Sequence, residues 1–416
     1  MRMRSWTAVA ATFAVILSLA PTAGADKSVP LVWHLETADG RELDSEQPDR
    51  FINPASVVKL ATSFRALATL GADHRFVTEF GVTIDESTKG ARDLVVSGGG
   101  DPDFHFENAV LAARGLAEAG VSAVPGDLIV GSSFWMGWER GSAGRLPEGV
   151  QRRAEMARRL MQAWSPDQWN AAEKEAWREM ALRRGWDPSR PPSVRIGGRV
   201  RGDSPPVWRR VLAHRSEPLL VALRRFNVFS NNDIERLDLT VGPPSGLRDF
   251  LVRRLGEDAE QSSFDSSSGL GRNRMSPRLV VHLLRDLRAF LKEKGHSERD
   301  LLPLLGCGDS TLRELFPRLR ESHEADGMAG KTGTLNTTDG GVSALAGYLP
   351  TKTGLVFFVA APGAGNVLPR ARAAEEDWVR KVLTRQGSVG PLSCPEPVPT
   401  SDRLAEVEPA SQATTN

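Results

Sequence analysis

Three short segments of this chain combine side chains that can perform nucleophilic catalysis. In the first, Ser56-Val57-Val58-Lys59, a serine and a lysine are three positions apart. If the segment is helical, residues at this spacing share a face, so the Ser56 hydroxyl and the Lys59 amine can meet. Lys59 can act as a base only when it is neutral, which requires burial or a neighbouring cation to lower its pKa. Any surface helix can carry such a pair, so this tetrapeptide alone is weak evidence.

The second segment, Ser230-Asn231-Asn232, follows an expected helix on a short turn. The Ser230 hydroxyl can relay a proton to a leaving amine, and the Asn232 amide can hold a substrate backbone. The same residue types are common in turns and caps without any catalytic role, because their side chains bond to the nearby backbone. This segment therefore supports catalysis only in combination with the others.

The third segment, Lys331-Thr332-Gly333, lies at the start of an expected strand and is followed by Thr334. Alternation along a strand puts Lys331 and Gly333 on one face and Thr332 on the other. Lys331 and the two threonine hydroxyls suit a terminal carboxylate, and Gly333 allows a ligand backbone to approach while the strand edge pairs with an extended peptide. A second Lys-Thr-Gly copy at 352–354 falls between two expected strands, and we interpret it as a turn.

A helix is expected to begin beside Ser56, with Asn53 as its N-cap and Pro54 at its first position. Apolar residues recur at helical spacing from Val57 to Gly71. The Ser56 backbone N–H then belongs to the first turn, where it has no intrahelical partner and lies at the positive end of the helix dipole. Such a group can donate to a developing oxyanion.

Two further regions have clear patterns. Apolar runs separated by short turns predict a three-strand antiparallel meander at 330–335, 343–349 and 355–361. Residues 147–186 are rich in Arg, Glu, Ala and Trp and predict one or two amphipathic helices broken near Ser165-Pro166. Tryptophan at helical spacing is more often core than partner surface, so we expect these tryptophans to be buried.

The overall composition is that of a globular protein with more than one domain. The chain has 416 residues, 40% of them hydrophobic, and a formal net charge of +1. This charge balance predicts no nucleic-acid partner. No Gly-x-Ser-x-Gly or His-Glu-x-x-His motif occurs, the seven histidines are scattered, and the glycines at 98–100 precede Asp101-Pro102 rather than a helix. We therefore expect neither a metal nor a cofactor.

The N-terminus has the pattern of a cleaved signal peptide. A short basic region precedes the apolar run from Ala8 to Ala20, and Ala23-Gly24-Ala25 follows as a small-x-small site. The run is shorter than the about 20 residues that a spanning helix needs, so no retained membrane span is expected. We expect the mature protein to begin near Asp26 and to be periplasmic or otherwise extracytoplasmic.

The chain has two cysteines, Cys307 and Cys394. Two cysteines exclude a disulfide scaffold, and whether they form a single bridge stays open at this stage. Residues 387–416 are rich in Pro, Ser, Thr and Glu, a composition that predicts a disordered tail.

Together and in this order, the three segments resemble the motifs of penicillin-recognising serine enzymes. The interval between Ser56 and Ser230 is much longer than in ordinary β-lactamases. It is similar to the interval in class C low-molecular-mass penicillin-binding proteins, the D-alanyl-D-alanine carboxypeptidase/endopeptidase family known as peptidase family S13. Segments 53–56, 98–102 and 265–277 also fit, as does Asp309-Ser310-Thr311-Leu312.

This resemblance implies a serine D-alanyl-D-alanine carboxypeptidase or endopeptidase that acts on peptidoglycan stem peptides through an acyl-enzyme and is acylated by β-lactams. Ser56 would be acylated after activation by Lys59, and the backbone N–H groups of Ser56 and Thr334 would form the oxyanion hole. The implied catalytic set is Ser56, Lys59, Ser230 and Asn232, and the implied substrate-binding set is Lys331, Thr332, Gly333 and Thr334.

The implied fold is an α/β (α+β) fold of the DD-peptidase/β-lactamase type, a mainly antiparallel sheet flanked by helices with a large insert after the nucleophile helix. The expected division is a signal peptide at 1–25, a catalytic domain at 26–72 and 208–386, an inserted domain at 73–207 and a disordered tail at 387–416.

Two departures from the family pattern leave alternatives open. Residues 127–134 lack the acidic pair usual in relatives, and 147–186 replace the usual insert sequence. They motivate a second hypothesis, a non-catalytic relative that binds cell-wall peptides or assembly partners. A third, a β-lactamase or esterase on the same fold, lacks a recognisable glutamate motif for fast deacylation. Carboxypeptidase versus endopeptidase preference and oligomeric state stay undetermined.

Overall fold

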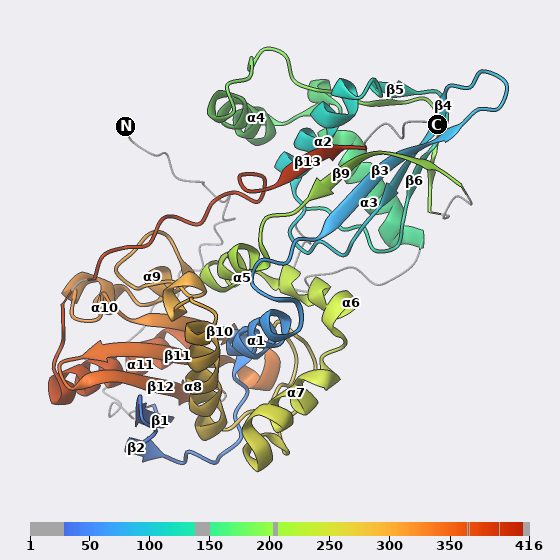
Figure 1. Ribbon diagram of the computed structural model, residues 1–416. Helices are drawn as coiled ribbons and strands as arrows, with labels where there is room; N and C mark the ends of the chain where they lie inside the picture. Colours follow the sequence, from blue (N-terminus) through green and yellow to red (C-terminus); the bar gives the residue numbers. More distant parts are fainter. Residues whose placement is uncertain are drawn as a thin grey trace, which may run out of the picture.

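The chain folds into two units, each built on its own large β-sheet (Figure 1). The computed structural model describes residues 29–137, 150–202, 207–363, 365, 367–390 and 392–410. The predicted signal peptide at 1–25 lies outside these residues. In the part of the chain that the structure describes, no helix has the length and apolar character needed to cross a membrane.

The first unit is centred on a five-stranded sheet in which every neighbouring pair is antiparallel. Its last three strands in sequence are the predicted meander, and the second Lys-Thr-Gly copy forms the turn between two of them, as predicted. In spatial order the strands are β10 (Ala329–Leu335), β11 (Val342–Thr351), β12 (Gly354–Pro362), β1 (Leu31–Thr37) and β2 (Glu42–Glu46).

Helices cover both faces of this sheet because alternate strand residues are apolar on each side. Ala346 and Val359 face one helical layer, whereas Leu345 and Phe358 face the other. The first layer contains α1 (Lys59–Leu70), α5 (Leu219–Val228), α7 (Ser245–Leu255) and α8 (Pro277–Glu293). The second contains α9 (Thr311–Leu315), α10 (Pro317–Ser322) and α11 (Leu368–Gln386). The predicted α+β fold with helices on both faces is confirmed.

Short helical segments connect these layers. They are η1 (Ala55–Val58), η3 (Asn232–Leu237), α6 (Asp238–Val241), η4 (Gly256–Ala259), η5 (Glu298–Asp300) and η6 (Thr338–Gly340).

The second unit contains a mixed six-stranded sheet, in which β4 pairs with β6 and β6 with β8 in parallel. Helix α2 (Phe106–Glu118) packs against it through an apolar core that includes Phe80 and Leu212. The strand order is β13 (Glu406–Pro409), β9 (Arg209–Arg215), β3 (Val77–Ile84), β4 (Ala91–Ser97), β6 (Leu128–Val130) and β8 (Val200–Arg201). Two short strands pair separately, β5 (Ala123–Val124) and β7 (Arg195–Ile196).

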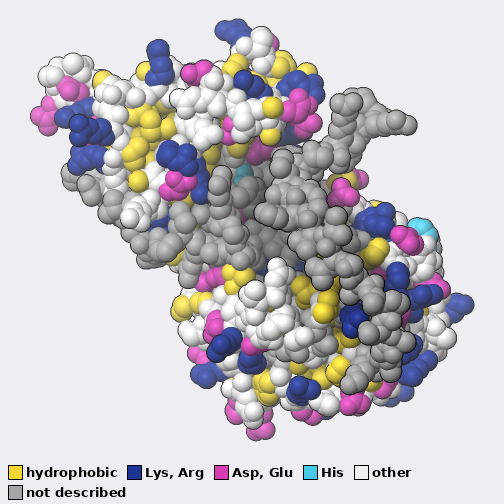
Figure 2. Space-filling model, turned by 180° about the vertical axis from the view of Figure 1, so that it is seen from behind, with side chains coloured by type: hydrophobic (Ala, Val, Ile, Leu, Met, Phe, Trp, Pro, Cys, Tyr) yellow, Lys and Arg dark blue, Asp and Glu magenta, His cyan; other side chains and the backbone are white. Residues whose placement is uncertain are grey.

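The Arg- and Trp-rich stretch forms part of the second unit. It contains the two predicted helices, α3 (Val150–Ala163) and α4 (Ala171–Arg183), separated by η2 (Pro166–Gln168) at the predicted break. Trp164, Trp169 and Trp177 are buried, and Trp186 is partly buried against the cluster of Trp169 and Trp177, so the prediction of core tryptophans is confirmed for three of the four. Figure 2 shows charged side chains of both signs scattered over both units, in keeping with the small net charge.

The predicted boundary after residue 207 differs from the structure. Strand β9 pairs with β3 over Val77 to Val82 and belongs to the sheet of the second unit. The second unit therefore extends to about residue 215. The sequence misled here because the alternating pattern of a strand does not say which sheet the strand joins.

The prediction of a disordered tail is wrong for most of residues 387–410. Strand β13 pairs with β9, so the chain returns from the first unit to complete the sheet of the second (Figure 1). Asp402 is fully buried and pairs with Arg183 of α4 at 2.8 Å. A composition poor in apolar residues predicts disorder only when the segment has no other partner, and here the partners are a strand edge and a buried charge pair.

A disulfide between Cys307 and Cys394 ties this tail to the first unit. The two cysteines are 87 positions apart, so the bridge closes a long loop of the unfolded chain.

Replacing both cysteines by serine should lower the free energy of unfolding by about 4.6 kcal/mol, the loop-closure estimate for a ring of this size. Urea unfolding of the wild type and the double variant measures the difference. Thiol-reduced wild type serves as the control and should match the variant. A loss below about 1 kcal/mol would mean that the tail is held by its other contacts rather than by the bridge.

Candidate active site

Ser56 lies in η1, the tight turn that leads into α1. The predicted N-cap is wrong by one position: the first turn is a 3-10 helix that begins at Ala55 with Pro54 as its N-cap. The Asn53 side chain still accepts a hydrogen bond from the Ala55 N–H at 3.1 Å. Ala55 has a left-handed backbone with φ of 47°. Such strain in a residue with a side chain persists only when the surroundings enforce it, and it is typical of functional sites.

The surroundings that enforce this turn are two glycines. A Cβ atom on Gly333 would collide with the Pro54 carbonyl oxygen, and one on Gly269 would collide with the Ala55 carbonyl oxygen. Gly269 also has a φ of 93°, which disfavours any side chain. We expected Gly333 to allow the close approach of a ligand backbone. In the structure, the backbone that lies against the position of its missing side chain is that of the turn carrying Ser56.

The Lys59 amine forms three hydrogen bonds and is completely buried. Its Nζ lies 2.9 Å from Ser56 Oγ, 2.7 Å from Asn232 Oδ1 and 2.8 Å from the Ser268 carbonyl oxygen. A neutral amine has two N–H donors and one lone pair, which matches two carbonyl acceptors and one hydroxyl donor. The geometry thus suits a neutral lysine that accepts the Ser56 proton.

Burial lowers the pKa of Lys59 to about 7, while the nearby Glu235 carboxylate acts in the opposite direction. Glu235 accepts a hydrogen bond from the Ser268 N–H at 2.9 Å and so also fixes the carbonyl that Lys59 contacts. Near neutral pH a substantial fraction of Lys59 is therefore neutral and able to act as a base.

The Ser230 hydroxyl contacts a second buried lysine. Lys331 Nζ lies 2.9 Å from Ser230 Oγ and donates to the Thr332 carbonyl oxygen at 2.7 Å. Burial, with a smaller contribution from the nearby Lys59, holds the pKa of Lys331 well below its usual value. Ser230 has a left-handed backbone with φ of 54°, a second strained residue at this site.

The third segment lies on an edge strand, because β10 pairs with β11 at one end of the sheet. Thr332 Oγ1 donates to Thr311 Oγ1 at 3.2 Å, and Thr334 Oγ1 accepts from the Arg372 guanidinium at 3.3 Å. The two threonine hydroxyls are thus on the face of the strand opposite to Lys331, as the predicted alternation requires.

All eight predicted site residues therefore come together. Lys59 joins Ser56 to Asn232, Lys331 joins Ser230 to β10, and Gly333 packs on the nucleophile turn. The residues that sequence reasoning missed are Ser268, Glu235, Thr311 and Arg372. Ser268 and Thr311 lie in segments that fitted the family pattern without an assigned role, whereas no sequence signal marked Glu235 or Arg372.

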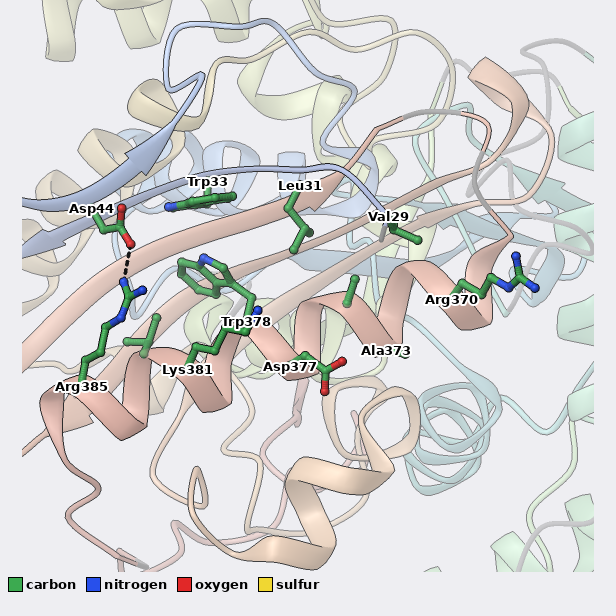
Figure 3. A pocket seen from close by; sticks show the side chains of 12 residues that line it. Val29, Leu31, Trp33, Asp44, Arg370, Ala373, Asp377, Trp378, Lys381 and Arg385 are labelled. Atoms are coloured by element: carbon green, nitrogen blue, oxygen red, sulfur yellow. Dashed lines mark hydrogen bonds and ion pairs between the residues drawn. The ribbon is translucent and has the colours of Figure 1, made fainter. Parts of the chain in front are cut away.

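Cavities lie beside this site. Phe229, which precedes Ser230, lines one cavity of about 770 Å³ between the two units and another of about 450 Å³ that includes Thr311. A third pocket, of about 470 Å³, lies between β1 and α11 and contains none of the eight residues (Figure 3). The groups that line this third pocket are surface groups such as the Asp44–Arg385 ion pair at 2.9 Å. We therefore do not take it as the candidate active site.

Within the described residues, one cluster is close enough to hold a metal ion: His34, Glu36 and His282. Both histidines contact the Glu36 carboxylate, at 2.7 and 3.2 Å, and Arg285 pairs with its other oxygen at 2.7 Å. The cluster is a charge network between β1 and α8 and includes none of the predicted site residues.

Comparison with known proteins shows which family this chain belongs to. The profile of the D-Ala-D-Ala carboxypeptidase 3 (S13) family matches residues 26–148 and 194–382. A D-alanyl-D-alanine carboxypeptidase from Actinomadura sp. (strain R39) is 38% identical over 107 residues, which cover 26% of this chain. The aligned region spans only 20% of that relative's length.

Solved structures share the fold at low sequence identity. A predatory peptidoglycan endopeptidase from Bdellovibrio bacteriovorus is 18% identical with a TM-score of 0.76, over 92% of this chain and 100% of that one. The same endopeptidase acylated by penicillin G has a TM-score of 0.73 at 19% identity, over 91% of this chain and 99% of that one. Penicillin-binding protein 4 from Haemophilus influenzae has a TM-score of 0.61 at 16% identity, over 86% and 97% of the two chains. Because the family profile matches most of its length, the chain belongs to the D-Ala-D-Ala carboxypeptidase 3 (S13) family.

Proposed function

We propose that this protein is a serine D-alanyl-D-alanine peptidase that cleaves peptidoglycan peptides, as a carboxypeptidase or an endopeptidase, through an acyl-enzyme. The observation that carries the proposal is the buried Lys59 amine, 2.9 Å from Ser56 Oγ with a pKa lowered to about 7. A serine hydroxyl becomes an effective nucleophile only beside such a base.

In the proposed acylation step, Ser56 Oγ attacks the carbonyl carbon of the penultimate D-alanine while its proton passes to neutral Lys59. The backbone N–H groups of Ser56 and Thr334 stabilise the oxyanion of the tetrahedral intermediate. The intermediate collapses to the ester and breaks the C–N bond. The leaving amine takes the Ser230 hydroxyl proton, and the proton that Lys59 accepted replaces it, so that Lys59 is neutral again. Lys331 holds the Ser230 hydroxyl, and Asn232 orients Lys59. Water then hydrolyses the ester and regenerates Ser56.

Substrate binding follows from the position of β10 at the sheet edge. An extended stem peptide can add to this edge by backbone hydrogen bonds, with its terminal carboxylate near the Thr332 and Thr334 hydroxyls. The cavities on either side of Phe229 offer room for the rest of the peptide. A β-lactam places its reactive carbonyl in the same position, and a penicillin G-acylated structure exists for the Bdellovibrio bacteriovorus endopeptidase.

We also propose export to the periplasm or another extracytoplasmic compartment after removal of residues 1–25. A substrate in the cell wall requires it, and the Cys307–Cys394 disulfide suits an oxidising compartment.

The first test is intact-mass analysis of residues 26–416 after incubation with benzylpenicillin. The wild type should gain the mass of one penicillin, and Ser56→Ala should gain none because the nucleophile is missing. Release of D-alanine from a stem peptide should follow the same pattern. A folded wild type that forms no adduct and releases no D-alanine would instead support the non-catalytic binding protein.

The acylation rate should depend on pH through Lys59. Because burial lowers the pKa of Lys59 to about 7, the base is protonated and inactive below this pH and neutral above it. The rate constant for penicillin acylation should therefore rise through a midpoint near pH 7 and level off. Stopped-flow measurements between about pH 5.5 and about pH 9 test this expectation. A rate that does not change over this range would exclude Lys59 as the base.

The Glu235→Gln variant should move that midpoint to lower pH. The Glu235 carboxylate raises the pKa of Lys59, and an amide keeps the hydrogen-bond acceptor for the Ser268 N–H but removes the charge. We expect a shift of up to about one pH unit. Glu260→Gln, an exposed glutamate outside the site, is the matched control and should leave the midpoint in place. An unshifted midpoint in Glu235→Gln would mean that its charge does not reach Lys59.

A further inference from the structure

Two histidines and a glutamate meet where β1 packs against α8. His34 and Glu36 are two positions apart on β1, so their side chains leave the same face of the strand as Val32, which belongs to the core beneath the α8 layer. His282 lies on α8 and contacts Glu36. Both residues of β1 are buried, and burying polar side chains at such positions costs free energy unless they have partners.

The metal-binding atoms of these three side chains converge. His34 Nε2 lies 2.7 Å from Glu36 Oε1, and His282 Nε2 lies 3.2 Å from the same oxygen. All three atoms lie within 4.8 Å of one another. The ligand atoms of a tetrahedral Zn²⁺ ion, each bound at about 2.0 to 2.2 Å, are roughly 3.3 Å apart. Small movements of these side chains would therefore bring them to the geometry of a zinc site.

The groups behind these side chains are those that commonly orient metal ligands. His282 Nδ1 lies 2.7 Å from Asp258 Oδ2, so the carboxylate can hold the proton on Nδ1 and leave the Nε2 lone pair free for a metal. Arg285 donates to Glu36 Oε2 at 2.7 Å, which fixes the carboxylate and leaves Oε1 facing the two histidines. Metal-bound histidines and carboxylates are usually held by outer hydrogen bonds of this kind.

His34 provides a second, independent observation. Its ring is fully buried, and among the described residues its Nδ1 has no hydrogen-bond partner. If Nε2 carries the proton and donates to Glu36, Nδ1 is a buried acceptor without a donor, which costs free energy. If Nε2 binds a metal, the proton moves to Nδ1, where the Glu42 carboxylate lies 3.7 Å away on an exposed side chain that can approach. Metal binding thus resolves an unsatisfied buried group.

The network around the two histidines carries an excess of negative charge. Its carboxylates are those of Glu36, Glu42, Asp49 and Asp258, and its guanidinium groups are those of Arg278 and Arg285. With neutral histidines, the carboxylates exceed the guanidinium groups by two charges. A divalent cation would balance this excess, and a bound cation is often the largest local charge of its site.

We propose that His34 Nε2, His282 Nε2 and Glu36 Oε1 bind a Zn²⁺ ion, with water as the remaining ligand. His282 is partly exposed, so the ion and its water can enter from solvent. Imidazole ligands suit Zn²⁺, whereas Mg²⁺ prefers oxygen ligands. The ion would tie the first strand of the sheet to α8 and stabilise the first unit. The site contains none of the candidate catalytic residues, so the inference does not depend on the proposed peptidase function.

The test measures zinc binding by untagged protein of residues 26–416 that has first been treated with a chelator. Equilibrium dialysis with metal analysis should show a single Zn²⁺ ion bound per wild-type chain and far weaker binding of Mg²⁺. Zn²⁺ should also raise the midpoint temperature of thermal unfolding, because a ligand that binds only the folded state stabilises it.

The variants separate this site from other zinc-binding groups. Asp258→Asn should lower the zinc affinity by roughly 10- to 100-fold, the range for loss of an outer hydrogen bond, and His282→Gln by more than about 100-fold, because it removes a ligand. His323→Asn is the matched control, since it removes an exposed histidine that also contacts a carboxylate, Asp326 at 2.9 Å. It should bind Zn²⁺ as the wild type does.

A folded wild type that takes up no Zn²⁺ would overturn the inference and leave the cluster as a charge network balanced by protons. Zinc binding that persists in folded His282→Gln, or that is lost in His323→Asn, would overturn it as well, because the ion would then lie elsewhere. If His282→Gln does not fold, wild-type crystals grown with Zn²⁺ provide the test. Their anomalous zinc signal must lie between the Nε2 atoms of His34 and His282, and a signal only at other positions contradicts the inference.

Discussion

The active site depends on the burial of two lysines next to each other. Lys59 and Lys331 are both fully buried; burial lowers the pKa of each amine, and the nearby Lys59 lowers the pKa of Lys331 further. An unpaired buried charge costs several kcal/mol, whereas a neutral amine needs only hydrogen-bond partners. The protein supplies hydroxyl and carbonyl groups to both lysines, and the nearby Glu235 carboxylate is hydrogen-bonded to the Ser268 N–H. The low basicity that catalysis requires is thus a consequence of how the site is packed.

This packing requires three distant segments to meet, and the meeting is enforced by close backbone contact. The turn that carries Ser56 is held between β10 and the loop at 266–270, at positions where only glycine fits. A side chain at Gly269 or Gly333 would push the turn away and open the hydrogen bonds around Lys59. Gly333 is therefore as much a packing requirement of the nucleophile as a feature of the substrate-binding strand.

Elements set by local periodicity and site residues that lie in short family motifs were predictable from the sequence, whereas side chains that reach the site from outside those motifs were not. The Ser-x-x-Lys spacing, the meander of β10, β11 and β12, and the two helices around Pro166 follow from local periodicity and turn chemistry. All eight candidate site residues could be named because family motifs are short and local. Glu235 and Arg372 act across the fold, on Lys59 and on Thr334, and no spacing rule connects residues so far apart in the chain.

The errors at the unit boundary and in the tail have the same origin. Strand β9 and strand β13 each have a pattern compatible with several partners, and the pairing between them joins segments separated by most of the first unit's C-terminal half. The second unit is in turn attached to the active site: Arg236, fully buried in the turn that follows Asn232, donates to the Pro102 and Gly137 carbonyl oxygens at 3.0 and 2.7 Å. A displacement of the second unit would therefore move the segment that carries Asn232, and with it the acceptor that orients Lys59. The insert and the tail that completes its sheet therefore help to hold the geometry of the base.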